Sequence, residues 1–216
     1  MSDRYQSLKD HVYEYIASQI DTGQITAGDR ISEKEICDVM GVSRTPVREA
    51  LIQLAGEGYL ANLPRRGFRV LGFDDTTARE IFQIIGPLDG EAARLACEKL
   101  TDEDLAQLHF LVDSMDMAIK GGLFKKYDDM QREFHETYIS ECGNDRMITL
   151  LSKLNRHFIM REYHSVDRET TRKLLTIANA EHRQILELLE DKKGDEVRSY
   201  IRDVHWNVAN AGYTTW

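Results

Sequence analysis

Apolar residues recur at helical spacing along most of the chain, and only a short region around residue 65 alternates as strands do. The first amphipathic stretch runs from Tyr5 to about Asp21, and Gly23 is suited to end it. Its apolar residues lie four apart: Leu8, Val12, Ile16 and Ile20. This spacing predicts one helix with a single buried face.

A second, shorter helix is predicted to begin after Ser32. Ser32 and Glu35 have capping-box spacing, in which the serine hydroxyl accepts a backbone N–H of the first turn. The helix is expected to end at Gly41. It would contribute three residues to the core: Ile36, Val39 and Met40.

The stretch from Gly41 to Leu51 has the features of a sharp turn followed by a recognition helix. Gly41 gives the turn its backbone freedom, and the Ser43 hydroxyl is predicted to cap the helix. Pro46 lies in the first turn, where its missing N–H removes no helical hydrogen bond. The helix is expected to reach about Gly58. Four residues define its buried face: Val47, Ala50, Leu51 and Leu54.

Two short strands are predicted at Tyr59–Leu63 and Gly67–Leu71, because polar and apolar residues alternate there. A turn over Pro64–Gly67 joins them, and Gly67 allows that turn to be tight. Three helices followed by a hairpin predict a winged helix-turn-helix.

The rest of the chain is predicted to be helical. Thr76 or Thr77 can cap a helix that runs to about Leu100, but Gly86-Pro87 interrupts it. Proline removes one helical hydrogen bond and clashes one turn back, so a kink or two abutting helices are expected.

A capping sequence at Thr101–Asp104 opens the next helix, which is expected to end near Gly121-Gly122. Four more helices are predicted: Phe124–Cys142, Arg146–His164, Arg168–Leu189 and Asp195–Ala211. The predicted fold class is therefore mainly α. Its parts are a winged helix-turn-helix at residues 1–72, a hinge at 73–77 and an all-helical bundle at 78–216.

The net charge of −9 over 216 residues is unevenly distributed. Nine Lys/Arg and ten Asp/Glu lie within the first 72 residues, and the other 19 basic and 27 acidic residues follow. Within the first part, Arg65, Arg66 and Arg69 form a basic patch. A near-neutral domain with clustered cations can bind phosphates, because affinity follows the local contacts.

Three widely spaced cysteines, Cys37, Cys97 and Cys142, argue against a disulfide framework and predict a cytoplasmic protein. No segment approaches the ~20 apolar residues that a membrane span needs, so no membrane partner is expected.

Arg44, Thr45 and Arg48 lie in the first turns of the predicted recognition helix. Two arginines there oppose the helix dipole, and a nearby polyanion would explain them. The N-terminal end of a recognition helix enters the major groove in helix-turn-helix proteins. Ser43, at the start of the same helix, is assigned to the DNA-binding surface as well. Arg65 and Arg66, at the wing tip, would reach the DNA backbone or the minor groove.

The N-terminal part of the sequence also resembles a known protein family. Four segments together resemble the GntR family of bacterial transcription regulators: Ala27–Glu33, Gly41–Leu51, Leu54 and Glu57–Tyr59. The resemblance implies a DNA-binding surface built from Lys34, Arg44, Thr45, Arg48 and the wing glycine Gly67. It implies that Arg44 and Arg48 contact base edges or phosphates, that Thr45 contacts a phosphate and that Lys34 contacts the neighbouring backbone.

Three histidines, His135, His182 and His205, lie on apolar helical faces. Imidazoles that point into one helical bundle can bind a divalent transition metal. Taken one at a time, each histidine is better explained as a hydrogen-bonded core residue. The three together favour a shared site.

The second half of the chain resembles the effector domain of the FadR subfamily, called FCD. The resemblance rests on Gln131–His135, Gly143-Asn144, Glu181-His182 with Ile185, and His205. It implies a metal ligand set of His135, His182 and His205 with Gln131 as a fourth position, and an effector pocket that includes Gln131 and Tyr138. Zinc and nickel are the favoured ions.

Two positions depart from the pattern of that subfamily. Gln131 replaces an aspartate, and its neutral carbonyl is a weaker ligand. The site then either binds metal through three histidines or is a metal-free polar pocket. Ile85 and Asp89, around Gly86-Pro87, replace an arginine and a glutamate, so the ligand-binding role of that arginine does not carry over.

The functional prediction is a homodimeric regulator, of repressor type, that binds a pseudo-palindromic operator. A small-molecule effector, an organic acid, would modulate it and so control a metabolic operon. The alternative is a metal-dependent enzyme that uses the histidine cluster, and a third hypothesis makes the winged helix a protein-interaction module. No Glu-x-x-His motif, serine triad or phosphate loop is present, so no catalytic residue is assigned.

Overall fold

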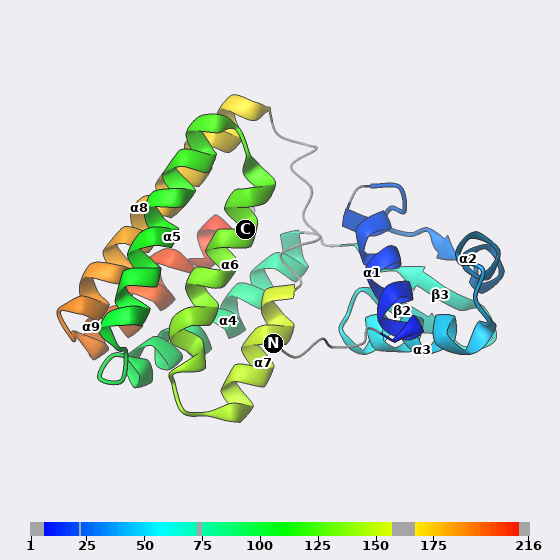
Figure 1. The fold of residues 1–216 in the computed structure, drawn as a ribbon, viewed down its shortest axis with the longest axis horizontal. Helices are drawn as coiled ribbons and strands as arrows, with labels where there is room; N and C mark the ends of the chain where they lie inside the picture. Colours follow the sequence, from blue (N-terminus) through cyan, green and yellow to red (C-terminus); the bar gives the residue numbers. More distant parts are fainter. Residues whose placement is uncertain (1–6, 22, 73–74, 157–166, 212–216) are drawn as a thin grey trace. The chain divides into compact units, whose positions relative to one another are not determined.

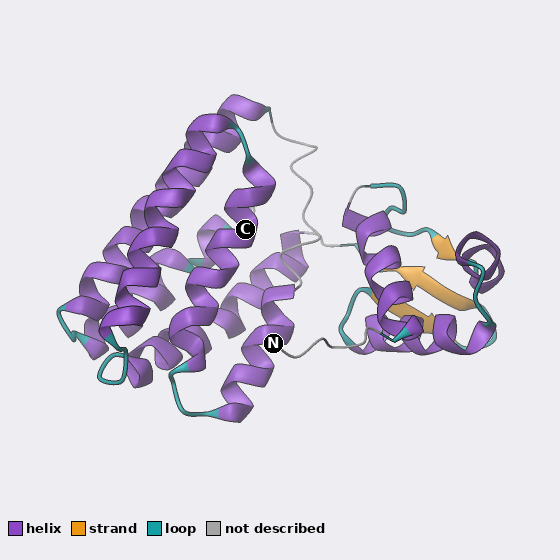
Figure 2. Ribbon diagram, in the orientation of Figure 1, coloured by secondary structure: helices purple, strands orange, loops and turns teal. Residues whose placement is uncertain are grey.

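The computed structural model describes residues 7–21, 23–72, 75–156 and 167–211 (Figure 1). Helices dominate, and one small sheet lies in the N-terminal part (Figure 2). The chain divides between Phe73 and Asp74 into two compact units. The predicted fold class, a winged helix-turn-helix followed by an all-helical domain, is confirmed.

The N-terminal unit contains three helices and a three-stranded antiparallel sheet in the order β1-β3-β2. The helices are α1 (Leu8–Asp21), α2 (Glu33–Met40) and α3 (Arg44–Gly56), and the strands are β1 (Arg30–Ile31), β2 (Leu60–Leu63) and β3 (Gly67–Val70). Helices α1 and α3 pack together, and α3 also contacts β2. The predicted apolar face of α3 is fully buried: Val47, Ala50, Leu51 and Leu54.

Local sequence explains the ends of α2. The Ser32 hydroxyl accepts a hydrogen bond from the Glu35 N–H at 3.2 Å, as the capping-box spacing predicts. Gly41 ends the helix with φ of 67°, in the left-handed region that favours glycine.

Four details of this unit differ from the predictions. Leu8 and Val39 are 61% and 67% exposed, so neither belongs to the core. Ser43 occupies the N-cap position of α3, but its side chain makes no capping hydrogen bond. Strand β1 was not predicted, because a two-residue strand carries no alternation and exists only through its pairing with β3.

The C-terminal unit is entirely helical in its described residues. Its α-helices are α4 (Asp75–Ala96), α5 (Asp102–Gly121), α6 (Phe124–Ser140), α7 (Asp145–Arg156), α8 (Arg168–Glu190) and α9 (Gly194–Tyr200). A π-helix, η3 (Ile201–His205), and a 3₁₀ turn, η4 (Val208–Asn210), follow. Helix α5 packs against α6 and α8, and α4 packs against α9 and η3 (Figure 1).

The start of this unit differs from the predictions in two respects. Residues 75–77, predicted as part of the hinge, are the first residues of α4, so Thr76 and Thr77 lie within the helix. Of the two alternatives expected at Gly86-Pro87, two abutting helices are not observed, because α4 continues through this pair as one helix and ends at Ala96. Its packing against α9 and η3 outweighs the local cost of the proline, since tertiary contacts override propensity.

The end of the chain also differs from a single regular helix. The predicted helix from Asp195 becomes a π-helix at Ile201, and His205 is the last residue of that π-helix. The predicted helix Arg146–His164 is observed to Arg156, and its remainder lies outside the described residues.

All three cysteines are free thiols, as predicted. In the described part of the chain, no helix combines the length and the apolar character needed to cross a membrane.

Candidate functional site

The first turns of α3 carry Arg44, Thr45 and Arg48, and all three side chains are exposed. No acidic residue lies in this first turn, so no side chain there offsets Arg44 or the positive end of the helix dipole. An anion such as a DNA phosphate would satisfy both the arginines and the helix N-terminus.

Other predicted DNA-binding residues are exposed as well. Lys34 lies on α2, and Arg65 and Arg66 lie in the turn between β2 and β3. Arg65 has φ of 62° and Gly67 has φ of 79°, so the wing turn uses the left-handed region twice. The Ser43 hydroxyl is exposed and makes no capping bond, which leaves it available to a ligand.

A second cluster lies inside the C-terminal unit, where His135, His182 and His205 come together. They are contributed by α6, α8 and η3, and each is at most 4% exposed. One nitrogen of each ring lies within 4.8 Å of the others. The structure thus brings together the three histidines that the sequence singled out.

Carboxylates orient two of these rings. His135 Nδ1 lies 2.9 Å from Asp89 Oδ2, and His205 Nδ1 lies 3.0 Å from Glu181 Oε2. The opposite nitrogens face each other, with 3.2 Å between His135 Nε2 and His205 Nε2. Carboxylates that hold histidines by one nitrogen and free the other for an ion are typical of metal sites.

Burial keeps two of the imidazoles neutral. Desolvation, reinforced by the other histidines, lowers the pKa of His182 well below its usual value. Desolvation and His135 likewise lower the pKa of His205. Metal ligation requires neutral imidazole, so the protonation state suits an ion. Desolvation raises the pKa of the adjacent Glu181 to about 7.

The donor set fits a divalent transition metal. In a tetrahedral site with metal–nitrogen distances near 2.05 Å, two ligand nitrogens lie about 3.3 Å apart. The observed 3.2 Å between the two Nε2 atoms matches that spacing. Gln131, one turn before His135, has a buried Oε1 with no hydrogen-bond partner among the described residues, and a cation would satisfy it.

Asp89 is the residue of this site that sequence reasoning did not assign. It is 1% exposed and accepts hydrogen bonds from Tyr138 Oη at 2.7 Å and from Trp206 Nε1 at 2.7 Å, besides its contact with His135. Burial alone would raise the pKa of Asp89, but His135 and these hydrogen bonds outweigh it and hold that pKa below its usual value. The available signal was a lone carboxylate on the apolar face of α4, four residues after Ile85.

Tyr138 was predicted to line an effector pocket. Its side chain is fully buried, and its hydroxyl donates to Asp89. Tyr138 therefore holds Asp89 in place beside His135, in the interior of the C-terminal unit.

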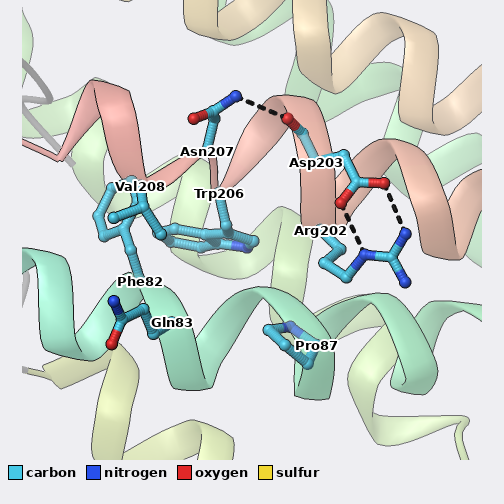
Figure 3. Close-up of a pocket in the computed structure, with 8 residues that line it drawn as sticks. All are labelled: Phe82, Gln83, Pro87, Arg202, Asp203, Trp206, Asn207 and Val208. Carbon is cyan, nitrogen blue, oxygen red and sulfur yellow. Dashed lines mark hydrogen bonds and ion pairs between the residues drawn. The ribbon is translucent and has the colours of Figure 1, made fainter.

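A surface groove of about 520 Å³ lies between α4 and the η3 segment (Figure 3). Apolar and polar side chains line it: Phe82, Gln83, Pro87, Arg202, Asp203, Trp206, Asn207 and Val208. Arg202 and Asp203 pair with each other at its edge, at 2.6 and 2.7 Å. Neither predicted pocket residue, Gln131 or Tyr138, lines this groove. Trp206 forms part of the groove wall while its indole N–H reaches Asp89.

Comparison with protein families gives two matches. Residues 8–70 match the model described as bacterial regulatory proteins, gntR family, and residues 80–204 match the FCD domain. The second match contains His135 and His182, and His205 lies one residue beyond its end.

Individual proteins agree with these matches. The chain is 29% identical over 176 residues to the Nta operon transcriptional regulator of Aminobacter aminovorans, covering 81% of this chain and 80% of that protein. It is 27% identical over 196 residues to the transcriptional repressor RspR of Escherichia coli, covering 89% and 83%. The solved structure of Escherichia coli McbR/YncC has the same fold, with a TM-score of 0.77, 24% identity and coverage of 95% and 97%.

Proposed function

The chain belongs to the GntR family of bacterial regulatory proteins and carries an FCD domain, and on that premise we propose that it is a metal-dependent, effector-responsive repressor. Its relatives are named transcriptional regulators, so it is a transcription regulator and not an enzyme. The FCD domain supports placement in the FadR subfamily, and the name of RspR supports repression as the sign of control.

The N-terminal domain, residues 1–72, would bind one half of a pseudo-palindromic operator. The exposed arginines at the start of α3 carry this assignment. Arg44 and Arg48 would contact guanine edges or phosphates, and Ser43 and Thr45 would donate to phosphates. Lys34, Arg65 and Arg66 would contact the DNA backbone, with Gly67 permitting the tight wing turn.

The C-terminal domain, residues 78–216, would dimerise and hold the ion and effector. Two recognition helices must meet successive major-groove turns about 34 Å apart, so one copy binds only half a site. Phe110 and Met117, seven residues apart on α5, are 63% and 73% exposed and offer an apolar surface for a second copy. Substituting both with aspartate should convert a dimer into a 24.9 kDa monomer in sedimentation.

His135, His182 and His205 would hold a divalent ion, zinc or nickel, with Gln131 Oε1 beside them. Such an ion supplies a positive centre for an anionic ligand. The three imidazoles and the glutamine are neutral, so no charged group of the protein would ligate the ion, and the carboxylates behind His135 and His205 would compensate its charge only in part. A carboxylate effector would balance it, which favours an organic acid. By linkage, the effector and the operator must change each other's affinity by the same factor.

Selection of duplex DNA from a random-sequence library, followed by fluorescence polarisation, tests the DNA half. We expect Arg44→Ala to weaken binding to the selected sequence by roughly 10- to 100-fold, since a lost base contact costs about 1–3 kcal/mol. Arg146→Ala, which removes an exposed arginine from α7, is the matched control and should bind normally. Selection of no sequence, or equal binding by both variants, would reject the assigned surface.

A further inference from the structure

We infer that Asp89 is a positioning residue that directs His135 Nε2 at the ion and connects that histidine to Trp206 in the surface groove. The inference rests on the proposed metal site, because it assigns a role towards the bound ion. It goes beyond the ligand set, since Asp89 lies on α4 and offers no atom to the cluster of three imidazoles.

Three donors converge on this one carboxylate, two of them from α6 and the third from Trp206, directly after η3. His135 Nδ1 and Trp206 Nε1 approach Oδ2 at 2.9 and 2.7 Å, and Tyr138 Oη donates to Oδ1 at 2.7 Å. At 1% exposure, Asp89 has no access to water, so these partners replace its solvation.

The carboxylate determines which nitrogen of His135 carries the proton. Nδ1 of His135 lies 2.9 Å from Asp89 Oδ2 and 2.6 Å from Tyr138 Oη. An ionised carboxylate only accepts hydrogen bonds, and Tyr138 Oη donates its own proton to Oδ1, so both neighbours accept and Nδ1 must carry the proton. In the neutral ring the lone pair then lies on Nε2, which points at His205 Nε2 from 3.2 Å. His205 is arranged alike, with Nδ1 beside Glu181. The lone pair on His135 Nε2 needs a donor or a cation opposite it, and the proposed metal ion between the two Nε2 atoms meets that need.

Trp206 extends the arrangement to the surface. Its indole N–H binds Asp89, while the same side chain forms part of the groove wall beside Phe82 and Pro87 (Figure 3). Trp206 directly follows His205, the last residue of the π-helix. A change at the ion therefore reaches the indole by two short paths, through Asp89 and through the backbone.

Zinc titration of metal-stripped protein tests the inference. Asp89→Asn preserves the size of the side chain but removes the carboxylate, and we expect zinc affinity to fall about 10- to 100-fold. Asp195→Asn is the matched control, because Asp195 lies in α9 with its side chain 81% exposed. This variant should bind zinc as the unsubstituted protein does. Equal affinity of Asp89→Asn and the control would overturn the inference.

A second readout separates positioning from general stability. In a Trp216→Phe background, Trp206 is the one tryptophan of the chain, so its emission should change when zinc binds. Asp89→Asn should diminish that change even at saturating zinc. If Asp89→Asn does not fold, Trp206→Phe and Tyr138→Phe each remove one donor and keep the carboxylate. Each should then weaken zinc binding, and unchanged affinity in both would reject the role.

The orientation can also be measured without any ion. Histidine ¹⁵N shifts in the metal-free protein should show the proton of His135 on Nδ1, and Asp89→Asn should redistribute it. A proton on Nε2 in the unsubstituted protein would overturn the inference. If that protein binds no zinc while His135 has the expected tautomer, the proposed metal site fails and the positioning by Asp89 stands.

Discussion

Arg65 lies at the tip of the wing with φ of 62°, a conformation that costs a side-chain-bearing residue about 1 kcal/mol. Arg65→Gly should therefore raise the free energy of unfolding of the N-terminal domain by up to about 1 kcal/mol. It should also weaken operator binding and reduce the salt slope of log affinity by about one, because one phosphate contact is lost. Urea denaturation and polarisation at several salt concentrations measure the two effects.

Arg66→Gly is the control for this prediction. Arg66 does not have a positive φ, so glycine relieves no strain there while it removes the same charge. Its stability should not rise. If Arg65→Gly bound the operator as tightly as the unsubstituted protein does, the wing tip would not contact DNA. The left-handed conformation of Arg65 would then need another explanation.

At this scale the sequence predicted the residues whose signal is local. Arg44 and Arg48 are recognisable by their position in a helix turn, and the histidines by their place on apolar faces. Asp89 was not recognisable in this way. Its partners His135 and Trp206 lie 46 and 117 residues away, and only the packing of α4 against α6 and η3 brings them together. The capping hydrogen bond predicted for Ser43 was wrong for a related reason, because cap spacing does not determine the side-chain rotamer.

Among the elements, α4 and α9 approach closely at Gly90. A Cβ built there would lie 2.6 Å from the backbone oxygen of Arg198. Because a backbone atom cannot move aside as a flexible side chain can, Gly90→Ala should destabilise the C-terminal domain by about 1–3 kcal/mol. In the Trp216→Phe background, urea denaturation followed by the fluorescence of Trp206, which contacts α4 through Asp89, reports on this domain.

Gly56, at the end of α3, provides the contrast. A Cβ there meets nothing within 4 Å and φ is not positive, so Gly56→Ala should leave stability unchanged or raise it by up to about 1 kcal/mol. A Gly90→Ala protein as stable as Gly56→Ala would show that the packing of α4 against α9 is looser than described.

The capping box of α5 gives a prediction with a pH dependence. The Thr101 hydroxyl accepts from the Asp104 N–H, and the Asp104 carboxylate accepts from the Thr101 N–H and hydroxyl at 2.8 and 2.7 Å. These hydrogen bonds lower the pKa of Asp104. Because this pKa is lower in the folded than in the unfolded protein, where it is about 3.9, the carboxylate stabilises the fold at pH values above the unfolded-state pKa. That stabilisation is lost as the pH falls through the folded-state pKa.

Asp104→Asn should therefore be less stable than the unsubstituted protein at pH 7, and the difference should shrink as the pH falls from about 5 towards 3. Thr101→Ala should cost about 1 kcal/mol at pH 7. Glu103→Gln removes a neighbouring charge of the same helix turn that makes no such cap, and it controls for the helix dipole. A difference between Asp104→Asn and the unsubstituted protein that is constant with pH would contradict the role of the carboxylate.

Elements with strong local signals were predictable, and those produced by tertiary packing were not. The capping boxes and glycine stops located α2 and α5 to within a residue or two. The π-helix Ile201–His205 has no sequence signature, because its extra residue per turn is stabilised by the contacts of His205 and Trp206 with the cluster. For the same reason Pro87 was overestimated as a break in α4.

For the whole molecule, the division of charge has a consequence for DNA binding. The first 72 residues are nearly neutral, with five of their nine Lys/Arg on the recognition helix and wing, and the excess of acidic residues lies in the remainder. The acidic domain would repel DNA away from the operator and restrict adhesion to the arginine-bearing surface. The change from strand-like to helical patterning near residue 72 made the two-part organisation visible in the sequence, but effector and operator chemistry left no such pattern.

The central claim is that the three histidines of the C-terminal domain hold one divalent ion. X-ray absorption at the metal edge, on protein purified without chelator or metal-affinity resin, counts imidazole ligands directly. We expect one ion per chain with three imidazoles in its coordination shell, and loss of that ion in His182→Ala. A spectrum without imidazole scattering, or a full ion content retained by His182→Ala, would contradict it.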